Sequence, residues 1–307
     1  MNIGLLAVDS NYPNLALMKL SAAHKANGDN VDWYNPFDSY DIVYLSKIFS
    51  FTDDYPHPIV NAQLVKRGGT GYDYTTTLPA EIDSLQPDYS LYPSIDNRTA
   101  YGFLTRGCVR HCKWCIVPKK EGFIKPYMDI EQIAVNGRDK VVLMDNNVLA
   151  IDYGLQQIEK IAKLGIHVDF NQGLDARLVT EDVAQLLAKT KWIKRIRLAC
   201  DTPAQIAECD KAIDRIDKYG YKGQYLIYCI LLDDINECYE RVIHWRNRGS
   251  RFYPFCQPYR DLTKPNVIPK WQKDMATWAN KRQRFCTCDF KDYQPRKNFK
   301  CNKYFEL

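Results

Sequence analysis

The sequence of 307 residues predicts an α/β protein, with an N-terminal doubly wound parallel sheet followed by a second array of parallel strands and helices. Short apolar runs bounded by turn residues alternate with longer amphipathic runs throughout, which is typical of βα units. From Tyr101 onward this alternation repeats about every 25 to 35 residues. A stretch with several prolines, residues 78–93, separates the two arrays and indicates a domain boundary.

Residues 1–95 are expected to form a small Rossmann-like domain. Residues 61–71 form either a helix or a strand, and they end in the turn Gly68-Gly69-Thr70-Gly71. Free N–H groups in such a turn can bind a phosphate, although a glycine cluster also makes a tight turn. The other expected elements are strands at 3–8, 31–34 and 41–45 and a helix at 15–23.

Residues 96–256 are expected to contain six strands, each separated from the next by a helix, and residues 257–307 a C-terminal extension. The six strands are 100–105, 140–147, 167–171, 193–199, 224–232 and 251–255. The cysteine segment described below follows the first strand. The expected helices lie between consecutive strands, near 129–136 and at 154–164, 181–189, 203–219 and 235–248.

Three cysteines, Cys108, Cys112 and Cys115, are spaced C-x3-C-x2-C on one short segment. Three neighbouring thiolates suit a [4Fe-4S] cluster and leave its fourth iron open for a substrate or cofactor. A zinc site completed by His111 is the alternative, but no second cysteine pair lies at a conventional distance. A disulfide is less well supported, because the sequence has no secretory signal.

At these residues the chain resembles the radical S-adenosylmethionine (radical SAM) superfamily. The apolar run 100–105 precedes Arg106-Gly107 and the cysteines, and Trp114 occupies the aromatic position between the second and third cysteines. The resemblance implies a partial (β/α)6 barrel that binds a [4Fe-4S] cluster and S-adenosylmethionine (SAM). It also implies reductive cleavage of SAM to a 5′-deoxyadenosyl radical, which abstracts hydrogen from a substrate that the sequence does not identify.

The N-terminal region resembles the cobalamin-binding-like domain of one radical SAM branch. That branch carries an Asp-x-His-x-x-Gly motif, whereas the corresponding turn here is Asp9-Ser-Asn-Tyr-Pro-Asn14 and has no histidine. We therefore expect a degenerate domain without cobalamin, although binding without a histidine ligand stays open. Methylthiotransferases carry three further N-terminal cysteines, and none precedes Cys108 here, which argues against that activity.

The candidate cofactor-binding residues follow the ends of the predicted barrel strands, where active-site groups gather in parallel barrels. The resemblance implies that Met144, Asp145, Asn146 and Asn147 receive the amino group of SAM, unless they only form a turn. Asn171 and Arg177 follow the third strand, and Arg177 is either a carboxylate clamp or a surface ion pair. Asp201 is either a ligand contact or a helix cap before Pro203.

Composition restricts the remaining interpretations. The net charge of +5 does not by itself require nucleic acid, and the N-terminal apolar run is too short to span a bilayer. We expect a cytoplasmic enzyme with no membrane partner that receives electrons from a reductant such as flavodoxin or ferredoxin.

The C-terminal cysteines Cys286, Cys288 and Cys301 either bind a second metal or fill apolar gaps. The basic, aromatic tail makes a non-catalytic zinc or Fe–S nucleic-acid-binding module the alternative function.

Overall fold

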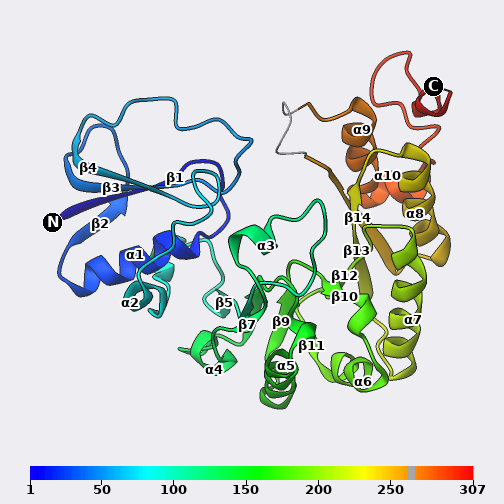
Figure 1. The fold of residues 1–307 in the computed structure, drawn as a ribbon, viewed down its shortest axis with the longest axis horizontal. Coiled ribbons are helices and arrows are strands. Elements are labelled where there is room, and N and C mark those ends of the chain that lie inside the picture. The colour runs from blue at the N-terminus through cyan, green and yellow to red at the C-terminus, as the bar shows by residue number, and fades with distance from the viewer. Residues whose placement is uncertain (261–266, 307) are drawn as a thin grey trace. The chain divides into compact units, whose positions relative to one another are not determined.

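The computed structural model describes residues 1–260 and 267–306 of the chain. The chain divides into two compact units, Met1–Tyr101 and Gly102–Leu307 (Figure 1). Both units are of the mixed α/β class with parallel sheets, as the sequence predicts. Among the described residues, no helix combines the length and apolar character needed to cross a membrane.

The first unit contains one four-stranded parallel sheet with the order β2-β1-β3-β4. Its strands are β1 (Asn2–Ala7), β2 (Asn30–Trp33), β3 (Tyr40–Ser46) and β4 (Ala62–Gly68), so the ambiguous segment 61–71 forms a strand. After β1 the chain adds β2 on one side and then β3 on the other. This reversal creates a switch point at the carboxyl end of β1, where open α/β sheets commonly bind ligands.

Helix α1 (Leu15–Ala26) covers one face of this sheet. Asn14 starts the helix, because its side-chain oxygen accepts a hydrogen bond from Leu17 N at 3.2 Å. Leu17 and Met18 are buried against Ile3 and Leu5 of β1. The opposite face is covered by side chains of the loop between β3 and β4, including Tyr55 and Ile59.

The glycine turn after β4 allows its backbone to pack closely against the backbone of Lys47. Gly69 has φ of +93°, and a Cβ atom there would lie 2.4 Å from the carbonyl oxygen of Lys47. Gly71 N donates a hydrogen bond to the same oxygen at 2.9 Å. The turn is therefore explained by the close approach of two backbone segments, and the N–H of Gly71 is used within the fold.

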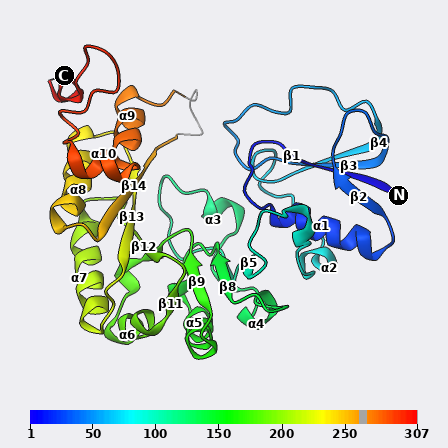
Figure 2. The same ribbon diagram turned by 180° about the vertical axis from the view of Figure 1, so that it is seen from behind.

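Two further four-stranded sheets have the orders β11-β9-β8-β5 and β10-β12-β13-β14, and the chain passes from the first unit to the second within β5. The pairs β11-β9, β9-β8, β10-β12, β12-β13 and β13-β14 are parallel. The six strands expected from the sequence correspond to β5 (Thr99–Gly102), β8 (Lys140–Leu143), β9 (His167–Phe170), β12 (Arg195–Ala199), β13 (Gln224–Leu231) and β14 (Phe252–Pro258). Short strands β10 (Leu174–Asp175) and β11 (Lys191–Trp192) are additional. Helices α5 (Asp152–Leu164), α6 (Glu181–Lys189), α7 (Ala204–Lys218) and α8 (Ile235–Arg248) lie along the outer side of the strands (Figure 2).

An ion pair joins the two sheets where β9 and β12 lie next to each other. Arg197 Nε donates to Asp169 Oδ1 at 2.6 Å, and Arg197 Nη1 donates to the hydroxyl of Tyr228 at 2.8 Å. Strand β13 shows which face is covered by helices, since alternate residues from Tyr225 to Leu231 are fully buried and those between them only half-buried. The polar network therefore lies on the face of the strands turned away from the helices.

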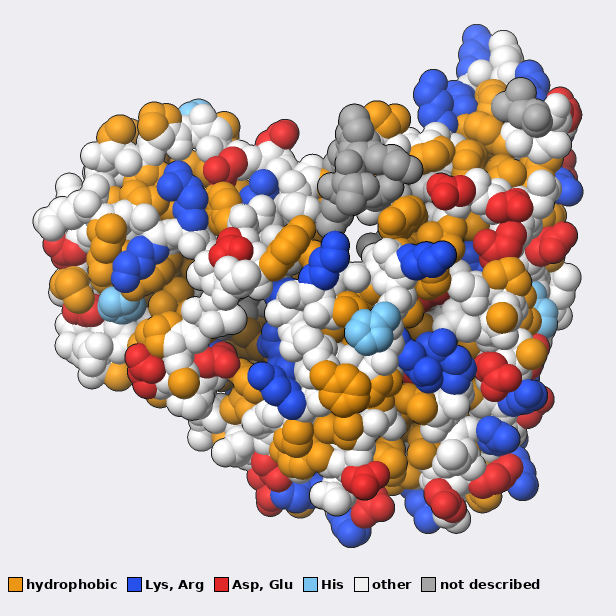
Figure 3. Space-filling view, viewed as in Figure 1, with side chains coloured by type: hydrophobic (Ala, Val, Ile, Leu, Met, Phe, Trp, Pro, Cys, Tyr) orange, Lys and Arg blue, Asp and Glu red, His pale blue; other side chains and the backbone are white. Residues whose placement is uncertain are grey.

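The described part of the C-terminal extension packs onto the second unit. Helix α9 (Lys270–Ala279) contacts β14, and Trp278 is fully buried with Phe285 of α10 (Arg282–Thr287) and Phe290. Cys301 is buried, whereas Cys286 is exposed. The expected segment 257–307 includes residues 261–266 and 307, which lie outside the described residues. Lys and Arg side chains are interspersed with Asp and Glu over the face of the molecule in Figure 3.

Candidate functional site around the cysteine loop

The three cysteines lie on a loop held at its base by a short antiparallel hairpin. Strand β6 (Thr105–Arg106) pairs with β7 (Lys125–Pro126), and the loop between them contains α3 (Val117–Lys120). Gly107 has φ of +85°, and a Cβ atom there would lie 2.4 Å from the oxygen of Phe123. Because only glycine fits at position 107, the Arg106-Gly107 step has a steric cause in this chain.

The three thiols are half-buried and lie within electrostatic range of one another. Burial raises the pKa of Cys112, an effect that the positive charge of Arg177 opposes. Burial also raises the pKa of Cys115. Two donors point at Cys108 Sγ, namely Arg110 N at 3.3 Å and Asn147 Nδ2 at 3.6 Å. Burial thus disfavours the thiolate form of these sulfur atoms, and the nearby N–H groups and the charge of Arg177 oppose that effect only in part.

Glu121 fixes the loop to the end of β8. Its carboxylate accepts hydrogen bonds from Arg106 Nε at 3.0 Å and Nη2 at 2.7 Å, and from Gly107 N at 2.9 Å. Asn146 Nδ2 donates to the same carboxylate at 2.9 Å. The predicted site residue Asn146 therefore contacts the loop through Glu121, which was not among the residues predicted from the sequence.

Asp175 connects the loop to two of the predicted site residues. Its carboxylate accepts hydrogen bonds from Arg110 Nε at 2.9 Å and from Arg177 Nε at 2.6 Å and Nη2 at 3.0 Å. Asn147 Nδ2 lies 3.5 Å from the same carboxylate. Burial alone would raise the pKa of Asp175, but Arg177 and Arg110 hold it below its ordinary value. The Nε and Nη2 atoms of Arg177 thus donate to a carboxylate of the chain itself, and not to a ligand.

Asp145 is engaged with the segment before the cysteines. Its carboxylate accepts from Leu104 N at 3.1 Å, and from Thr105 N at 2.6 Å and Thr105 Oγ1 at 2.7 Å. Met144 N donates to Gly102 O at 3.0 Å, so the end of β8 is joined to this segment by backbone as well. Burial raises the pKa of Asp145 to about 6.

This raised pKa predicts a pH-dependent stability contribution. The folded chain binds the proton of Asp145 more tightly than the unfolded chain, whose pKa is near 3.8, so ionisation of Asp145 opposes folding. Between about pH 4 and pH 6 the wild type should lose on the order of 2 kcal/mol relative to Asp145→Asn. Urea unfolding of both proteins at several pH values measures this difference, and a pH-independent difference would contradict it.

Asn171 and Asp201 make backbone contacts. The carbonyl oxygen of Asn171 accepts from the Tyr228 hydroxyl at 2.8 Å, and Asp201 Oδ1 accepts from Ile230 N at 3.0 Å. Helix α7 starts after Pro203 without a side-chain cap, so Asp201 does not cap it. Burial raises the pKa of Asp201. Its charge is felt at Cys112 and Arg177, which places it in the same electrostatic environment as the cysteine loop.

The donor set fits an iron–sulfur cluster in its chemistry. Among the described residues, no three or more His, Cys, Asp or Glu side chains are grouped so that they could hold a single metal ion. A mononuclear zinc site requires such convergence at about 2.0 to 2.3 Å from one ion, whereas each thiolate of a [4Fe-4S] cluster binds a different iron. Asn147 Oδ1 is buried without a hydrogen-bond partner, in a residue that is only 3% exposed. An unpaired buried acceptor beside Cys108 is costly unless a donor from a bound group occupies it.

The Asp175 network predicts that Asp175→Asn will loosen the cysteine loop. Because Arg110 and Arg177 are about one third exposed, the loss of unfolding free energy should be modest, at about 1 kcal/mol. Alkylation of Cys108 and Cys112 by iodoacetamide in the metal-free protein should accelerate severalfold. Asp233→Asn, which changes an exposed carboxylate, serves as the control. Equal alkylation rates in both variants would show that Asp175 does not order the loop.

The comparisons with known proteins support the fold. No protein-family model matches the sequence, and no curated protein sequence matches it. One similar solved structure is the radical S-adenosylmethionine methyltransferase TsrM from Kitasatospora setae, with tryptophan substrate and the SAM analogue aza-SAM bound. The TM-score is 0.60 at 10% sequence identity, and the match covers 84% of this chain and 73% of TsrM. The chain therefore shares the fold of a radical SAM enzyme over most of its length.

Proposed function

We propose that the chain is a radical SAM enzyme whose cluster is held by Cys108, Cys112 and Cys115. The cysteine loop carries this proposal, because its three thiols follow the first strand of a fold shared with a radical SAM enzyme. When bound, a [4Fe-4S] cluster supplies the electron that cleaves SAM to a 5′-deoxyadenosyl radical, which abstracts hydrogen from a substrate. The alternative, a zinc or Fe–S module that binds nucleic acid without catalysis, is not better supported, because the fold is shared with a radical SAM enzyme.

Asn147 is the residue best placed to receive the amino group of SAM. Its Nδ2 atom is directed to Cys108 Sγ and Asp175, which fixes the amide so that Oδ1 remains as a buried acceptor. An ammonium group is a suitable donor for that oxygen. By contrast, Asp145 and Asn146 use their polar atoms to bind Thr105 and Glu121, and we assign them the task of holding the loop.

Arg177 and Arg110 provide positive charge beside the thiols. The guanidinium groups of Arg110 and Arg177 both pair with the carboxylate of Asp175. These three side chains together therefore carry one net positive charge. This charge can balance cluster thiolates or bind the carboxylate of SAM. Asp201 limits the excess, and its raised pKa reflects how little water reaches it. Exclusion of water is what protects a radical intermediate from side reactions.

The remaining parts of the proposal concern the partners and the first unit. We assign electron delivery to a flavodoxin or ferredoxin in the cytoplasm, and nucleic acid stays a candidate substrate. In the first unit, Asp9 accepts hydrogen bonds from Ile48 N at 2.9 Å, Phe49 N at 2.8 Å and Thr52 Oγ1 at 2.7 Å. Asp9 thus stabilises the turn, and with no histidine in 9–14 we propose an activity that does not use cobalamin.

Anaerobic reconstitution with iron and sulfide tests the proposed function. The protein should bind about four irons, show charge-transfer absorbance in the visible range and, with dithionite and SAM, release 5′-deoxyadenosine and methionine. Omission of dithionite is the control for non-reductive hydrolysis of SAM. A colourless protein that retains one zinc ion and forms no 5′-deoxyadenosine would contradict the proposal.

A further inference from the structure

The excess positive charge of the chain is concentrated in its C-terminal extension. Residues 270–306 contain ten Lys and Arg side chains against four Asp and Glu side chains. The whole chain has 42 basic and 37 acidic side chains, which leaves 32 basic against 33 acidic ones outside this segment. The rest of the chain is therefore close to neutral, and such an asymmetry indicates an anionic partner for the extension.

Helix α9 and the segment that follows α10 bring these charges to one surface. Arg296 Nη1 donates to Asp274 Oδ2 of α9 at 2.8 Å, and Arg284 Nη1 donates to Thr277 O of α9 at 3.1 Å. The two exposed lysines that stand four residues before Asp274 and Thr277 share their helix face. We call the surface formed by these basic side chains the α9–tail surface; its residues are Lys270, Lys273, Arg284, Arg296, Lys297 and Lys303.

Most of this positive charge is not neutralised by carboxylates of the chain. In the described part of the structure, eight of the ten basic residues of 270–306 form no ion pair. The exceptions are Arg296 with Asp274 at 2.8 Å and Lys300 with Asp292 at 3.4 Å. Both side chains of the second pair are half or more exposed, so water screens their attraction. The charge of the surface is therefore available to a partner.

Aromatic rings orient several of the basic side chains. The guanidinium carbon of Arg296 lies 3.9 Å from the centre of the Phe299 ring, and Lys303 Nζ lies 6.0 Å from the same ring. Arg284 lies over the Tyr293 ring at 5.7 Å. A ring orients a cation without removing its charge. A guanidinium plane held in this way can pair with a phosphate or stack on a base.

We propose that the α9–tail surface binds single-stranded nucleic acid. The lysines contact phosphate groups along the strand, and unpaired bases stack on the guanidinium planes of Arg284 and Arg296. A duplex has a higher density of phosphates, but its bases are already stacked on one another, so the surface favours the single strand. This proposal names a substrate class for the proposed radical SAM function, although the binding itself needs no cluster.

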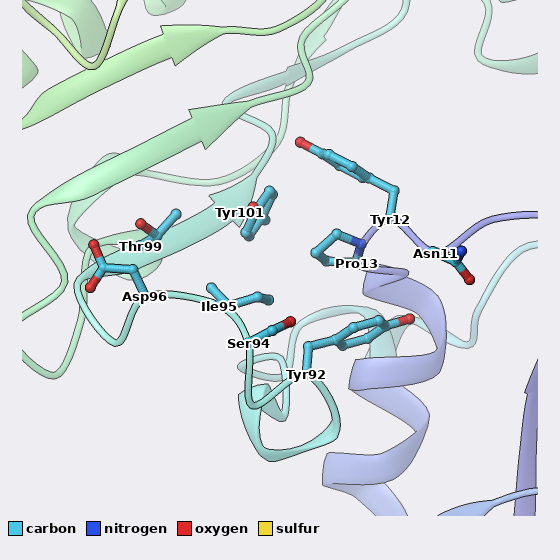
Figure 4. Close-up of a pocket in the computed structure, with 9 residues that line it drawn as sticks. All are labelled: Asn11, Tyr12, Pro13, Tyr92, Ser94, Ile95, Asp96, Thr99 and Tyr101. Atoms are coloured by element: carbon cyan, nitrogen blue, oxygen red, sulfur yellow. The ribbon is translucent and has the colours of Figure 1, made fainter.

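The cavity of the first unit is not suited to this partner. Its volume is about 440 Å³, and its lining residues include no Lys or Arg side chain. Figure 4 shows instead that tyrosines, Tyr12, Tyr92 and Tyr101, surround much of it. A strand of phosphates needs basic contacts. Tyr12→Leu, which changes the wall of this cavity, should therefore leave the binding of nucleic acid unchanged.

Fluorescence anisotropy on the metal-free full chain tests the proposal. The probe is a fluorescein-labelled RNA of about 20 nucleotides without self-complementarity, titrated between about 50 and 200 mM NaCl. The triple variant Lys270→Gln/Lys273→Gln/Lys297→Gln removes three exposed charges that form no ion pair in the described part of the chain. It should weaken binding at least about tenfold and reduce the slope of log K against log salt by about 2.

A second triple variant is the matched control. Lys163→Gln/Lys189→Gln/Lys222→Gln removes the same charge from α5, α6 and the turn before β13, and α5 and α6 lie at the end of the second unit opposite to α9 (Figures 1 and 2). It should bind RNA as the wild type does. Equal weakening by both triple variants would overturn the assignment, because net charge alone would then explain the binding.

Two further outcomes would overturn the proposal itself. One is the absence of RNA binding by the wild type, and the other is equal or tighter binding of the RNA duplex of the same length. Tighter binding of anionic phosphatidylglycerol vesicles, lost in the first triple variant, would reassign the surface to membranes. Iron content and SAM cleavage are measured separately, so these outcomes are distinct from a failure of the proposed radical SAM function.

Discussion

Cys112→Ala is expected to abolish the cleavage of SAM. Under the proposed function, loss of one of the three thiolates would remove an iron ligand directly. Loss of an outer hydrogen-bonding partner alone typically costs 10- to 100-fold in metal affinity. Formation of 5′-deoxyadenosine should therefore fall by at least about two orders of magnitude. The iron content after anaerobic reconstitution, measured together with 5′-deoxyadenosine, reports whether binding and cleavage are lost in parallel.

Cys286→Ala is the matched control, since it removes an exposed cysteine of the same second unit. Its iron content and SAM cleavage should equal those of the wild type. Thermal unfolding of both variants distinguishes loss of the site from loss of the fold, because Cys112 is only half-buried and its truncation leaves the strands in place. Retention of four irons and full cleavage by Cys112→Ala would refute the assigned cluster ligands.

Arg241→Met is expected to be the most destabilising single substitution considered. The Arg241 side chain is fully buried in α8, with 0% exposure. Its Nη1 atom donates to Cys200 O at 2.8 Å, Nη2 to Ile230 O at 2.9 Å and Nε to Glu237 Oε1 at 2.7 Å. Methionine would leave two buried carbonyl groups and one carboxylate without their donor. Removing one partner of a buried charged pair costs about 3 to 5 kcal/mol.

Urea unfolding followed by circular dichroism measures this loss. Arg246→Met is the control on the same helix, since Arg246 is partly exposed and its ion pair with Asp289 is 3.3 Å long. We expect that variant to lose less than about 1 kcal/mol. A loss of similar size in both variants would show that the carbonyl contacts of Arg241 at the ends of β12 and β13 contribute little.

Much of the fold could be predicted because the long elements have clear hydrophobic periods. The expected strand 224–232 is observed as Gln224–Leu231, and the expected helix 203–219 as Ala204–Lys218. The expected helix 129–136 is only Ile130–Ile133, because Ala134 leaves the helical conformation and Asn136 and Gly137 take positive φ. Strands of two residues such as β10 and β11 carry no periodic signal, so the sequence could not predict them.

The site was predictable where the chemistry is local and not where it depends on tertiary contacts. Three cysteines on one loop are recognisable from their spacing alone. Asp175 and Glu121 were missed, because their partners Arg110 and Asn146 are 65 and 25 residues away in the sequence. The polar run 171–177 contained a usable signal, since Asp175 and Arg177 stand two residues apart. The sequence did not indicate that these two side chains would pair with each other.

The side chain of Asn280 pairs with Cys256 of β14, which is an edge strand of its sheet. Asn280 Oδ1 accepts from Cys256 N at 2.7 Å, and Asn280 Nδ2 donates to Cys256 O at 2.9 Å. The Asn280 side-chain amide thereby makes the two hydrogen bonds that the backbone of a neighbouring strand would make with Cys256 at the edge of the sheet. Since the unpaired N–H and C=O groups of an edge strand can pair with a strand of another molecule, we expect this amide to hinder strand addition at Cys256.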